Sequence, residues 1–400
     1  MNNQPSPSEL YDLAIIGAGG AAHNILLALE RRGCLRSMKV LIFEPDTRKH
    51  NDRTWCFWTD QTDEAYDLNH QVISHQWSKI TATPQIAKRP LTYRYVHLRS
   101  ADLYQYVKEQ IEPYSRIYSI ADKITNLEEN PIEVVLSTSS DQEFRAKQVL
   151  DSRPPHSALK KETIVWQSFA GWRVKAPGAN WDFQHAVLMD FEVDQMKGTQ
   201  FIYFLPTSSD EALVELTRFA PDCISEEQAR PVLDQYLAGQ NAAEYTIEER
   251  EASRIPMTMR LSPSQGRRKS RILPIGAAGG VVKPSTGYAF KNMAQHAELI
   301  AQALENEKTL PLYRQRLLYR FCDTLLLRIL LEEPAWGQML FRSLFQHNEL
   351  PDIFRFLDEK ASTVLETLSS ERYQWLGNVP ISDLARILKK GENEQFRNKL

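Results

Sequence analysis

The chain has 400 residues and a formal net charge of −3, with 48 lysines and arginines against 51 aspartates and glutamates. This balance and the lack of a lysine-rich tract give no indication of nucleic-acid binding, and the length predicts two or three domains. Four scattered cysteines without a CxxC spacing indicate a reducing compartment, and no apolar run approaches the ~20 residues that cross a bilayer. The polar residues 1–10 predict that no signal peptide precedes the fold.

The first predicted element is a short buried strand that ends in a glycine-rich turn. Leu13–Ile16 is apolar, and Gly17-Ala18-Gly19 then leads into a helix with Ala22 in its first turn. In a GxGxxG/A pattern the first glycine permits a tight turn and the second lets the backbone approach a pyrophosphate. The last position lets the helix pack closely on the strand. The helix N-terminus would offer N–H groups to the phosphates.

A second apolar strand, Val40–Phe43, ends at Glu44. At this distance from the glycine turn, an acidic residue binds the ribose hydroxyls of a dinucleotide. We therefore predict a dinucleotide site that includes Gly17, Gly19 and Glu44. The alternative is a glycine turn in a βαβ unit that binds nothing.

The next elements are expected to complete the nucleotide-binding sheet. The segment Asn51–Trp58 carries two tryptophans and a phenylalanine, which either line a pocket or anchor a loop. Residues 93–98 predict a strand, followed by a helix over 100–111 with Ser100 as its N-cap. Residues 132–136 and 148–151 predict strands that return to the sheet.

From residue 164 the pattern changes to longer strands separated by turn residues, which predicts an inserted antiparallel sheet. The expected strands cover residues 166–174, 186–191, 199–205 and 212–219, and a helix capped by Ser225 covers 225–236. A strand over 270–275 then leads into a second glycine-rich turn, Gly276–Tyr288, which is expected to open a helix through Leu304. Two such turns far apart in the chain favour a large cofactor held at both ends, such as FAD.

These patterns predict an α/β protein in three parts. Residues 1–65, 91–160 and 255–305 form a discontinuous FAD-binding domain. Residues 66–90 and 161–254 form an inserted β-sheet domain for the substrate. Residues 306–400 form a helical C-terminal region.

Four segments carry a resemblance to a known family. They are Asn51–Trp58, Leu150–Arg153, Leu213–Thr217 and Lys283–Tyr288. They are similar to the NHTWSFH-like, IDGRG, LIEDT or FLEET, and HPTTGY or HPSTGY segments of the flavin-dependent lycopene cyclases of carotenoid biosynthesis. The resemblance extends from Tyr11 to about Lys389 and implies a glutathione-reductase-like (Rossmann) fold.

The resemblance also implies FAD as the cofactor, active in its reduced form, with NAD(P)H as the reductant. The residues expected to bind it are Gly17, Ala18, Gly19, Ala22, Glu44, Arg53, Asp151, Gly276, Pro284, Thr286, Gly287 and Tyr288. The chain departs from the family at Ser152, in place of a glycine, and at Lys283, in place of a histidine. It has Gly276-Ala277 where flavin monooxygenases of this fold usually carry Gly-Asp.

The activity implied by the resemblance is a non-redox, acid-catalysed cyclisation of the linear end groups of lycopene, an isomerase reaction. Such a reaction needs an acid that protonates a terminal double bond inside a dry pocket. Glu215 lies on an apolar strand, where burial would raise its pKa and keep it protonated. Because Leu216 replaces the second acidic residue of the family signature, only Glu215 is carried over as the acid. The alternative for Glu215 is a carboxylate on the solvent face of an edge strand.

Four aromatic residues are candidates to line the polyene pocket by cation–π contact: Trp55, Trp58, Trp172 and Tyr203. The alternative is that they are plain core residues. No metal site is expected, since the chain has no Asp-Asp pair and His70 and His75 match no common metal-ligand spacing.

The C-terminal third combines apolar residues at helical spacing with interleaved arginines. Such helices lie either in a membrane interface, with Phe341 and Phe345 among the contact residues, or against the core of the protein. An apolar substrate favours a cytoplasmic enzyme attached peripherally to the membrane. The runner-up function is a redox flavoenzyme of the same fold, a monooxygenase or polyprenyl reductase that acts on a lipid.

Overall fold

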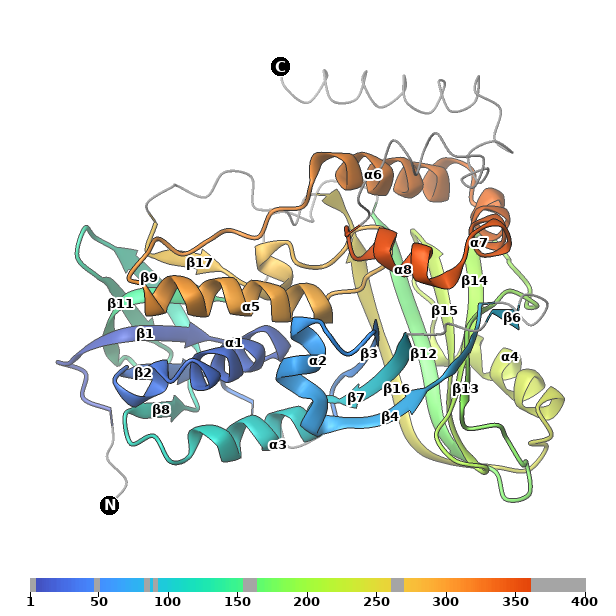
Figure 1. Cartoon of the computed structure of the whole chain (residues 1–400), viewed down its shortest axis with the longest axis horizontal. Coiled ribbons are helices and arrows are strands. Elements are labelled where there is room, and N and C mark those ends of the chain that lie inside the picture. The colour runs from blue at the N-terminus through green and yellow to red at the C-terminus, as the bar shows by residue number, and fades with distance from the viewer. Residues whose placement is uncertain are drawn as a thin grey trace.

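The computed structural model places a Rossmann-type sheet at one end of the molecule and a large antiparallel sheet at the other, with helices packed along both (Figure 1). It describes residues 5–46, 51–82, 87–88, 93–153, 164–259 and 270–360. Parts of the predicted loop after Glu44, of the crossover after Arg153 and of the helical C-terminal region, residues 361–400, lie outside the described residues.

The Rossmann-type sheet brings the ends of three parallel strands together. Its strands, in spatial order, are β8 (Ile117–Ile120), β2 (Val40–Phe43), β1 (Leu10–Ile16), β11 (Glu143–Asp151), β10 (Val134–Thr138) and β9 (Ile124–Glu129), and β17 (Ile272–Pro274) pairs with β11. Ile16 is the register partner of both Phe43 and Asp151. The residues that follow these strands therefore meet at the carboxyl edge of the sheet, where open α/β sheets bind ligands.

Both faces of this sheet are covered, which explains why β1 and β2 are apolar nearly throughout. One face packs on three helices: α1 (Gly20–Arg31), α3 (Ser100–Ile111) and α5 (Phe290–Glu305). On the other face, the side chains of β1 and β2 pack with aromatic and aliphatic side chains of β9, β10 and β11, which belong to the same sheet.

The antiparallel sheet forms the second half of the molecule. Its strands, in spatial order, are β16 (Thr246–Met257), β12 (Val165–Lys175), β15 (Glu211–Ala220), β14 (Thr199–Pro206), β13 (His185–Asp190), β5 (Lys79–Thr81) and β6 (Ala87–Lys88). Helix α4 (Glu226–Gly239) covers one face, and the C-terminal helices cover part of the other. Ser225 caps α4 in a complete capping box with Gln228, as expected.

A small third sheet joins the two halves. It consists of β3 (Thr54–Thr59), β7 (Arg94–Arg99) and β4 (Ile73–Trp77), and α2 (Glu64–Asn69) connects two of its strands. The aromatic segment around Trp55 is thus a strand between the two large sheets. Ser100 is the first residue of α3 and not its N-cap, and its hydroxyl accepts the backbone N–H groups of Asp52 and Arg53 at 3.0 Å each.

The second glycine-rich turn does not open a helix directly, in contrast to the expectation from sequence. Gly276–Gly279 forms a single 3-10 turn (η4), and α5 begins only at Phe290. The cause is backbone conformation, because Gly276, Gly280 and Gly287 all have positive φ angles. The segment is therefore a loop that folds back over the sheet.

Three helices follow α5: α6 (Leu317–Glu332), α7 (Ala335–His347) and α8 (Leu350–Leu357). Phe341 and Phe345 of α7 are only 7% and 5% exposed and pack in the core with Phe191 and Phe219, so the expectation that they contact a membrane is wrong. Among the described residues, every helix is too short or too polar to cross a bilayer.

Candidate active site

The first glycine turn has a conformation that only glycine tolerates. Gly17 has a φ of 87°, and a Cβ at this position would lie 2.2 Å from the Oγ atom of Ser152. Ser152 itself donates to the carbonyl oxygen of Ile16 at 2.7 Å, so its hydroxyl fills the space that the glycine leaves. The turn is thereby fixed at the ends of β1 and β11.

An open cradle lies beside this turn. A Cβ at Gly19 would meet no atom within 4 Å, and no side chain caps the N-terminus of α1 there. Glu44 lies at the same edge, where its Oε2 atom accepts the N–H of Ala18 at 2.8 Å. Ala22 is fully buried between helix and sheet. Exposed N–H groups, free space and an acid at the end of β2 fit the phosphates and a ribose of a dinucleotide.

The second glycine turn lies against the first. A Cβ at Gly276 would approach the Cβ of Ala21 to 3.3 Å, so the two turns are neighbours at the N-terminus of α1. Further along, Gly287 has a φ of 71°, and a Cβ there would lie 2.2 Å from the Oε1 atom of Gln167 on β12. This loop therefore connects the dinucleotide cradle to the antiparallel sheet.

A cavity of about 540 Å³ lies between this loop and the antiparallel sheet. Apolar and aromatic side chains dominate its wall near the loop, including Trp55, Phe290 and Met293. Among the residues expected to bind the cofactor, four line the cavity: Arg53, Thr286, Gly287 and Tyr288. The glycine-turn residues and Glu44 lie at the cradle instead. Neither Pro284, which is buried, nor Asp151, whose carboxylate is held by Arg153 at 2.8 Å, lines the cavity.

The structure brings two of the four aromatic candidates into the cavity, Trp55 and Tyr203. The expectation that Trp172 lines the cavity is wrong. Trp172 points to the opposite face of the sheet and is fully buried in the core beneath α4. Trp58 also belongs to the core, where it stacks on Phe354 and donates to Asp358 at 2.9 Å. Alternation along a strand explains the difference, since neighbouring residues face opposite sides.

Glu215 faces the cavity from the middle of the antiparallel sheet. It belongs to a row of register partners on four strands, Tyr203, Glu215, Gly171 and Glu251. The protein encloses Glu215, and this loss of solvent, together with the charge of Glu251, raises its pKa well above the usual range. A carboxyl that stays protonated at neutral pH can act as a general acid.

Glu251 is the functional candidate that the sequence analysis missed. Its side chain is hydrogen-bonded to that of Glu215, and Thr54 donates to its Oε2 atom at 3.1 Å. Burial raises its pKa, while the hydrogen bonds from Glu215 and Thr54 oppose that rise. The sequence of β16 gave no local signal, because the partly buried positions between Ile247 and Ile255 are the polar residues Glu249, Glu251 and Ser253.

Comparison with known proteins agrees with this geometry. The family model described as "Lycopene cyclase protein" matches residues 12–365. The chain belongs to this family. It is 25% identical to lycopene beta-cyclase from Pantoea ananas over 283 residues, which cover 70% of this chain and 71% of the relative. It is 24% identical to lycopene beta-cyclase from Pseudescherichia vulneris over 319 residues, or 76% and 77% of the two chains.

Solved structures confirm the Rossmann-type flavoprotein fold expected from the sequence. A geranylgeranyl bacteriochlorophyll reductase-like protein from Thermoplasma acidophilum aligns with a TM-score of 0.57 at 12% identity, over 96% of this chain and 99% of that one. A variant of HpxO from Klebsiella pneumoniae, in complex with FAD, aligns with a TM-score of 0.55 at 12% identity. The alignment covers 88% of this chain and 98% of HpxO.

Leu216 occupies the second acidic position of the lycopene cyclase signature in this chain. Leu216 is fully buried beneath α4, on the face of the sheet opposite Glu215. An acid there would point away from the cavity. The second carboxylate that does reach Glu215 comes instead from β16, as Glu251.

Three tyrosines lie beside Glu215 in the cavity wall: Tyr95, Tyr203 and Tyr288. The phenol oxygens of Tyr203 and Tyr288 lie 3.5 Å apart, and burial raises the pKa of all three, so they remain neutral. Neutral phenols present electron-rich ring faces without adding charge to the pocket. Among the described residues, no group of three His, Cys, Asp or Glu side chains is placed to hold a metal ion.

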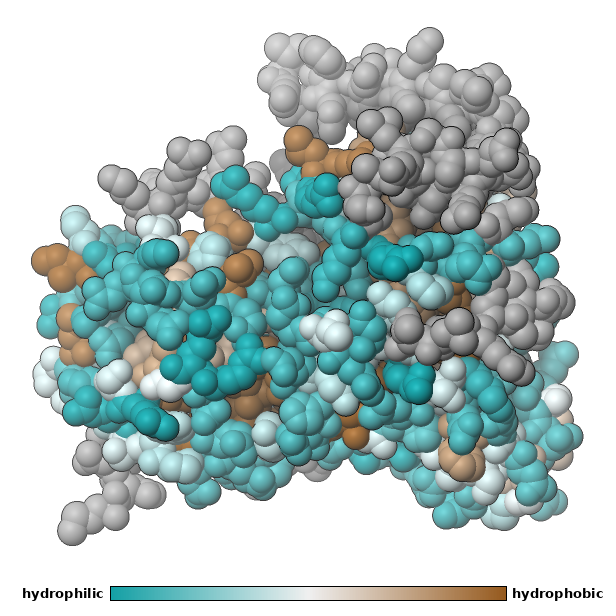
Figure 2. Space-filling model, in the orientation of Figure 1, coloured by the Kyte–Doolittle hydropathy of each residue, from teal (hydrophilic) through white to brown (hydrophobic). Residues whose placement is uncertain are grey.

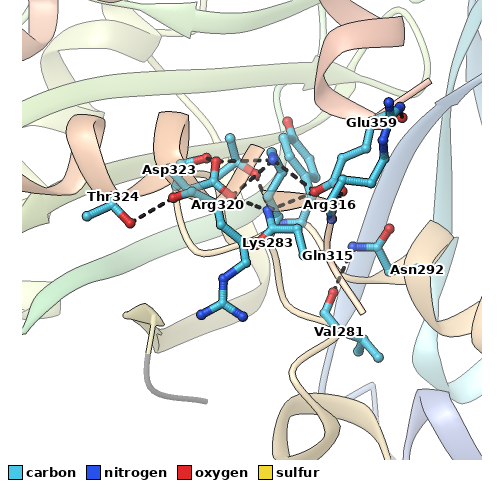
Figure 3. Close-up of polar contacts among 12 residues, drawn as sticks. Val281, Lys283, Asn292, Gln315, Arg316, Arg320, Asp323, Thr324 and Glu359 are labelled. Atoms are coloured by element: carbon cyan, nitrogen blue, oxygen red, sulfur yellow. Dashed lines mark hydrogen bonds and ion pairs between the residues drawn. The ribbon is translucent and has the colours of Figure 1, made fainter. Parts of the chain in front are cut away.

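Lys283, which replaces the histidine of the family motif, is buried in an ion-pair network (Figure 3). Its Nζ atom lies 3.1 Å from Asp323 of α6 and 3.4 Å from Glu359. Ser285 donates to Asp323 at 2.6 Å, and Gln315 donates to both carboxylates. The cavity loop is thereby fastened to the C-terminal helices.

Proposed function

We propose that the protein converts the linear end groups of lycopene to β-ionone rings, and so forms gamma-carotene and beta-carotene without net electron transfer. The observation that carries this function is the position of the Glu215 carboxyl, whose pKa is raised by burial and which faces an apolar, aromatic cavity beside the dinucleotide cradle. Membership of the lycopene cyclase family supports it.

The chain's own residues can supply the acid and the dry pocket that this isomerisation needs. Glu215 gives its proton to the terminal double bond, so its O–H bond breaks and a C–H bond forms. The next double bond then attacks the carbocation and closes the ring, and the ring carbon loses a proton to a carboxylate. The ring faces of Tyr203 and Tyr288 stabilise the cation, and the apolar wall near Trp55 excludes water.

The cradle fits FAD, with the pyrophosphate at the N-terminus of α1, the ribose at Glu44, and the second glycine turn and the 286–288 loop beside the rest of the molecule. When bound in its reduced form, FAD supplies negative charge that stabilises a nearby cation. NAD(P)H is the proposed source of the electrons that keep it reduced.

Gly19→Val is expected to abolish FAD retention and leave the fold intact. The φ of Gly19 is −88°, which valine adopts, and a Cβ there meets no protein atom. The added side chain therefore enters only the space proposed for the pyrophosphate. Flavin absorbance and circular dichroism of the purified variant provide the test. Stoichiometric FAD in Gly19→Val would refute the assignment.

The activity itself is tested by expression in a host that accumulates lycopene, followed by pigment analysis. A cyclase produces carotenoids of the same mass as lycopene. The runner-up, a redox flavoenzyme that acts on a lipid, is favoured by the shared fold with a reductase-like protein, and its product would differ in mass. Pigments that differ from lycopene by added oxygen or hydrogen would therefore replace the cyclase assignment.

Because lycopene is an apolar polyene, we infer that the protein works in the cytoplasm at a membrane surface. Apolar side chains lie exposed at the start of α6, where Leu317 is 85% and Phe321 is 48% exposed (Figure 2). These two residues are one helical turn apart and share a face, with Arg314 and Arg316 nearby to meet lipid headgroups.

Leu317→Glu combined with Phe321→Glu is expected to lower co-sedimentation with anionic liposomes several-fold, because the substitutions place charges in the apolar contact. FAD content should not change. Ile132→Glu is the matched control, since Ile132 is 71% exposed on the turn between β9 and β10. Equal sedimentation of the α6 double variant and the control would contradict a membrane contact through α6.

A further inference from the structure

Two carboxyl groups can meet across a strand of the antiparallel sheet because the residue between them is a glycine, which has no side chain. Glu215 on β15 and Glu251 on β16 are both register partners of Gly171, on the strand between them. Neighbouring strands are about 4.8 Å apart, so the two backbones are about 10 Å apart and the side chains reach toward each other over Gly171. A Cβ at Gly171 would lie 2.9 Å from the Cβ of Glu215, closer than such atoms approach.

The hydrogen bond between the two carboxyls requires that they share a proton. Two ionised carboxylates repel each other and have no hydrogen to share, so the pair holds one proton in the closed site. Thr54 donates to Glu251, which stabilises the charged form of Glu251. The shared proton therefore resides mainly on Glu215, with Glu251 as the anionic acceptor.

Glu251 also borders a second cavity, which Glu215 does not reach. This polar cavity, so called here for its charged side chains, measures about 420 Å³ and is lined by Asn51, Thr54, His97, Arg99, Ala101, Arg173, Leu213, Glu249, Arg250 and Glu251. Glu215 borders only the larger, more apolar cavity, whereas Glu251 borders both. Glu251 is thus the carboxylate that borders the cavity with the charged side chains and is also hydrogen-bonded to the acid facing the larger cavity.

We propose that Glu251 is the proton-relay partner of Glu215, which takes up protons from the polar cavity and passes them to Glu215 across Gly171. The inference rests on the proposed function of Glu215. The acid gives its proton to the substrate and is left as a carboxylate. A proton then moves from solvent in the polar cavity to Glu251, and from Glu251 to Glu215, while the proton lost by the ring returns to solvent by the same path. Protons entering and leaving are equal in number.

The charges around the pair come from several elements. Arg53, which immediately precedes β3, favours the ionised form of Glu251, and Glu249 on the same strand as Glu251 opposes it. Tyr203, Tyr288 and Cys56 face the pair as neutral groups whose pKa values are raised by burial. In the polar cavity, burial and the charge of Arg173 lower the pKa of His97 to about 3, so His97 is neutral there. The remaining cavity charges are those of Arg99, Arg173 and Arg250.

Glu251→Gln tests the relay through the pH dependence of the rate. A neutral neighbour removes the repulsion that keeps Glu215 protonated, so the pKa of Glu215 falls. The alkaline limb of the kcat profile is expected to move to lower pH, with about a tenfold loss of rate for each unit that the pKa falls. The rate should fall at every pH because the relay is lost, and by more near about pH 8 than near about pH 6. Glu248→Gln, on the exposed face of the same strand, should leave the profile unchanged.

Thr54→Val tests the same pair with Glu251 in place. The substitution removes the hydroxyl that donates to Glu251 and keeps the shape of the side chain. A less stabilised Glu251 carboxylate holds the shared proton more tightly, so the alkaline limb should move to higher pH. Shifts in opposite directions for Thr54→Val and Glu251→Gln support the relay. A uniform loss of rate in both variants, with unmoved pH profiles, would overturn it.

An infrared titration separates failure of the relay from failure of the proposed function. The carbonyl band of the protonated pair is expected to persist to alkaline pH in the wild type, to disappear in Glu215→Gln, and to titrate at lower pH in Glu251→Gln. Absence of cyclic carotenoid with the wild type would refute the function alone. An identical titration in wild type and Glu251→Gln would refute the relay alone.

Discussion

Glu215→Gln is expected to fold, retain FAD and lose cyclisation by a factor of about 10²–10⁴ or more. The amide keeps the shape of the side chain and can still accept from Thr217, which donates to Glu215 at 2.6 Å. It has no transferable proton. The apolar wall of the cavity disfavours a water molecule as a substitute acid, and Leu216 points to the opposite face of the sheet.

Pigment analysis in a lycopene-producing host measures the loss, together with the FAD content of each variant. Glu211→Gln is the matched control, because Glu211 lies on the same strand and forms a surface ion pair with Lys175. Glu215→Asp should retain partial activity, limited by a reach about one methylene too short. Beta-carotene formation by Glu215→Gln at a rate near that of the wild type would show that the acid lies elsewhere.

The same substitution should raise thermal stability at neutral and alkaline pH. Since the pKa of Glu215 is raised on folding, the native state binds more protons than the unfolded state above the unfolded pKa of about 4.5. Native stability therefore falls as pH rises toward the folded pKa, by up to about 1.4 kcal/mol for each pH unit. Glutamine removes this dependence. The melting temperature of the Glu215→Gln variant should exceed that of the wild type by a margin that grows with pH.

Local patterns in the sequence predicted the first βαβ unit of the Rossmann half, but not its strands β8 and β9. The strand Val40–Phe43 has the predicted bounds, and the glycine turn, Glu44 and α1 meet as expected. The pattern is informative because parallel strands buried on both faces read as apolar runs, and because glycine turns have fixed spacing. Four strands of the antiparallel sheet, β12 to β15, were also predicted to within a few residues.

The acid pair could not be predicted from local pattern. Glu251 lies in a glutamate-rich segment that was not recognised as a strand, and its partner Glu215 is far from it in sequence. Only the strand order, with β12 between β15 and β16, brings both to Gly171. Tertiary packing likewise determines which face of the sheet Trp172 lies on and whether Phe341 is buried, because amphipathic spacing does not show what covers an apolar face.

The network around Lys283 depends on the same kind of long-range contact, and it carries the second large effect. Lys283 and Asp323 have side chains that are each 4% exposed, and Glu359 shares the lysine. Removal of the Lys283 ammonium, which contacts both carboxylates, leaves Asp323 without its cation in a buried space. Breaking a buried pair in this way costs about 3–5 kcal/mol, because the remaining charge is uncompensated.

Lys283→Met is therefore expected to lower the free energy of unfolding by about 3–5 kcal/mol. Lys79→Met provides the contrast, since the pair of Lys79 with Asp182 at 2.8 Å is about half exposed and should contribute only about 0–1 kcal/mol. Combining Lys283→Met with Asp323→Asn should recover part of the loss, because the amide keeps the hydrogen bond with Ser285 and removes a charge. Chemical denaturation of the three variants gives the comparison.

The network also has a functional consequence, because Lys283 begins the loop that carries Thr286, Gly287 and Tyr288 into the cavity. If Lys283 fastens this loop to α6, its loss should weaken FAD retention before the protein unfolds. Lys283→Met combined with Asp323→Asn should recover part of the FAD retention and part of the stability. Measurement of flavin release against temperature separates the two events. Release that coincides with global unfolding in every variant would assign the network to stability alone, and earlier release in Lys283→Met would assign it to the cofactor loop.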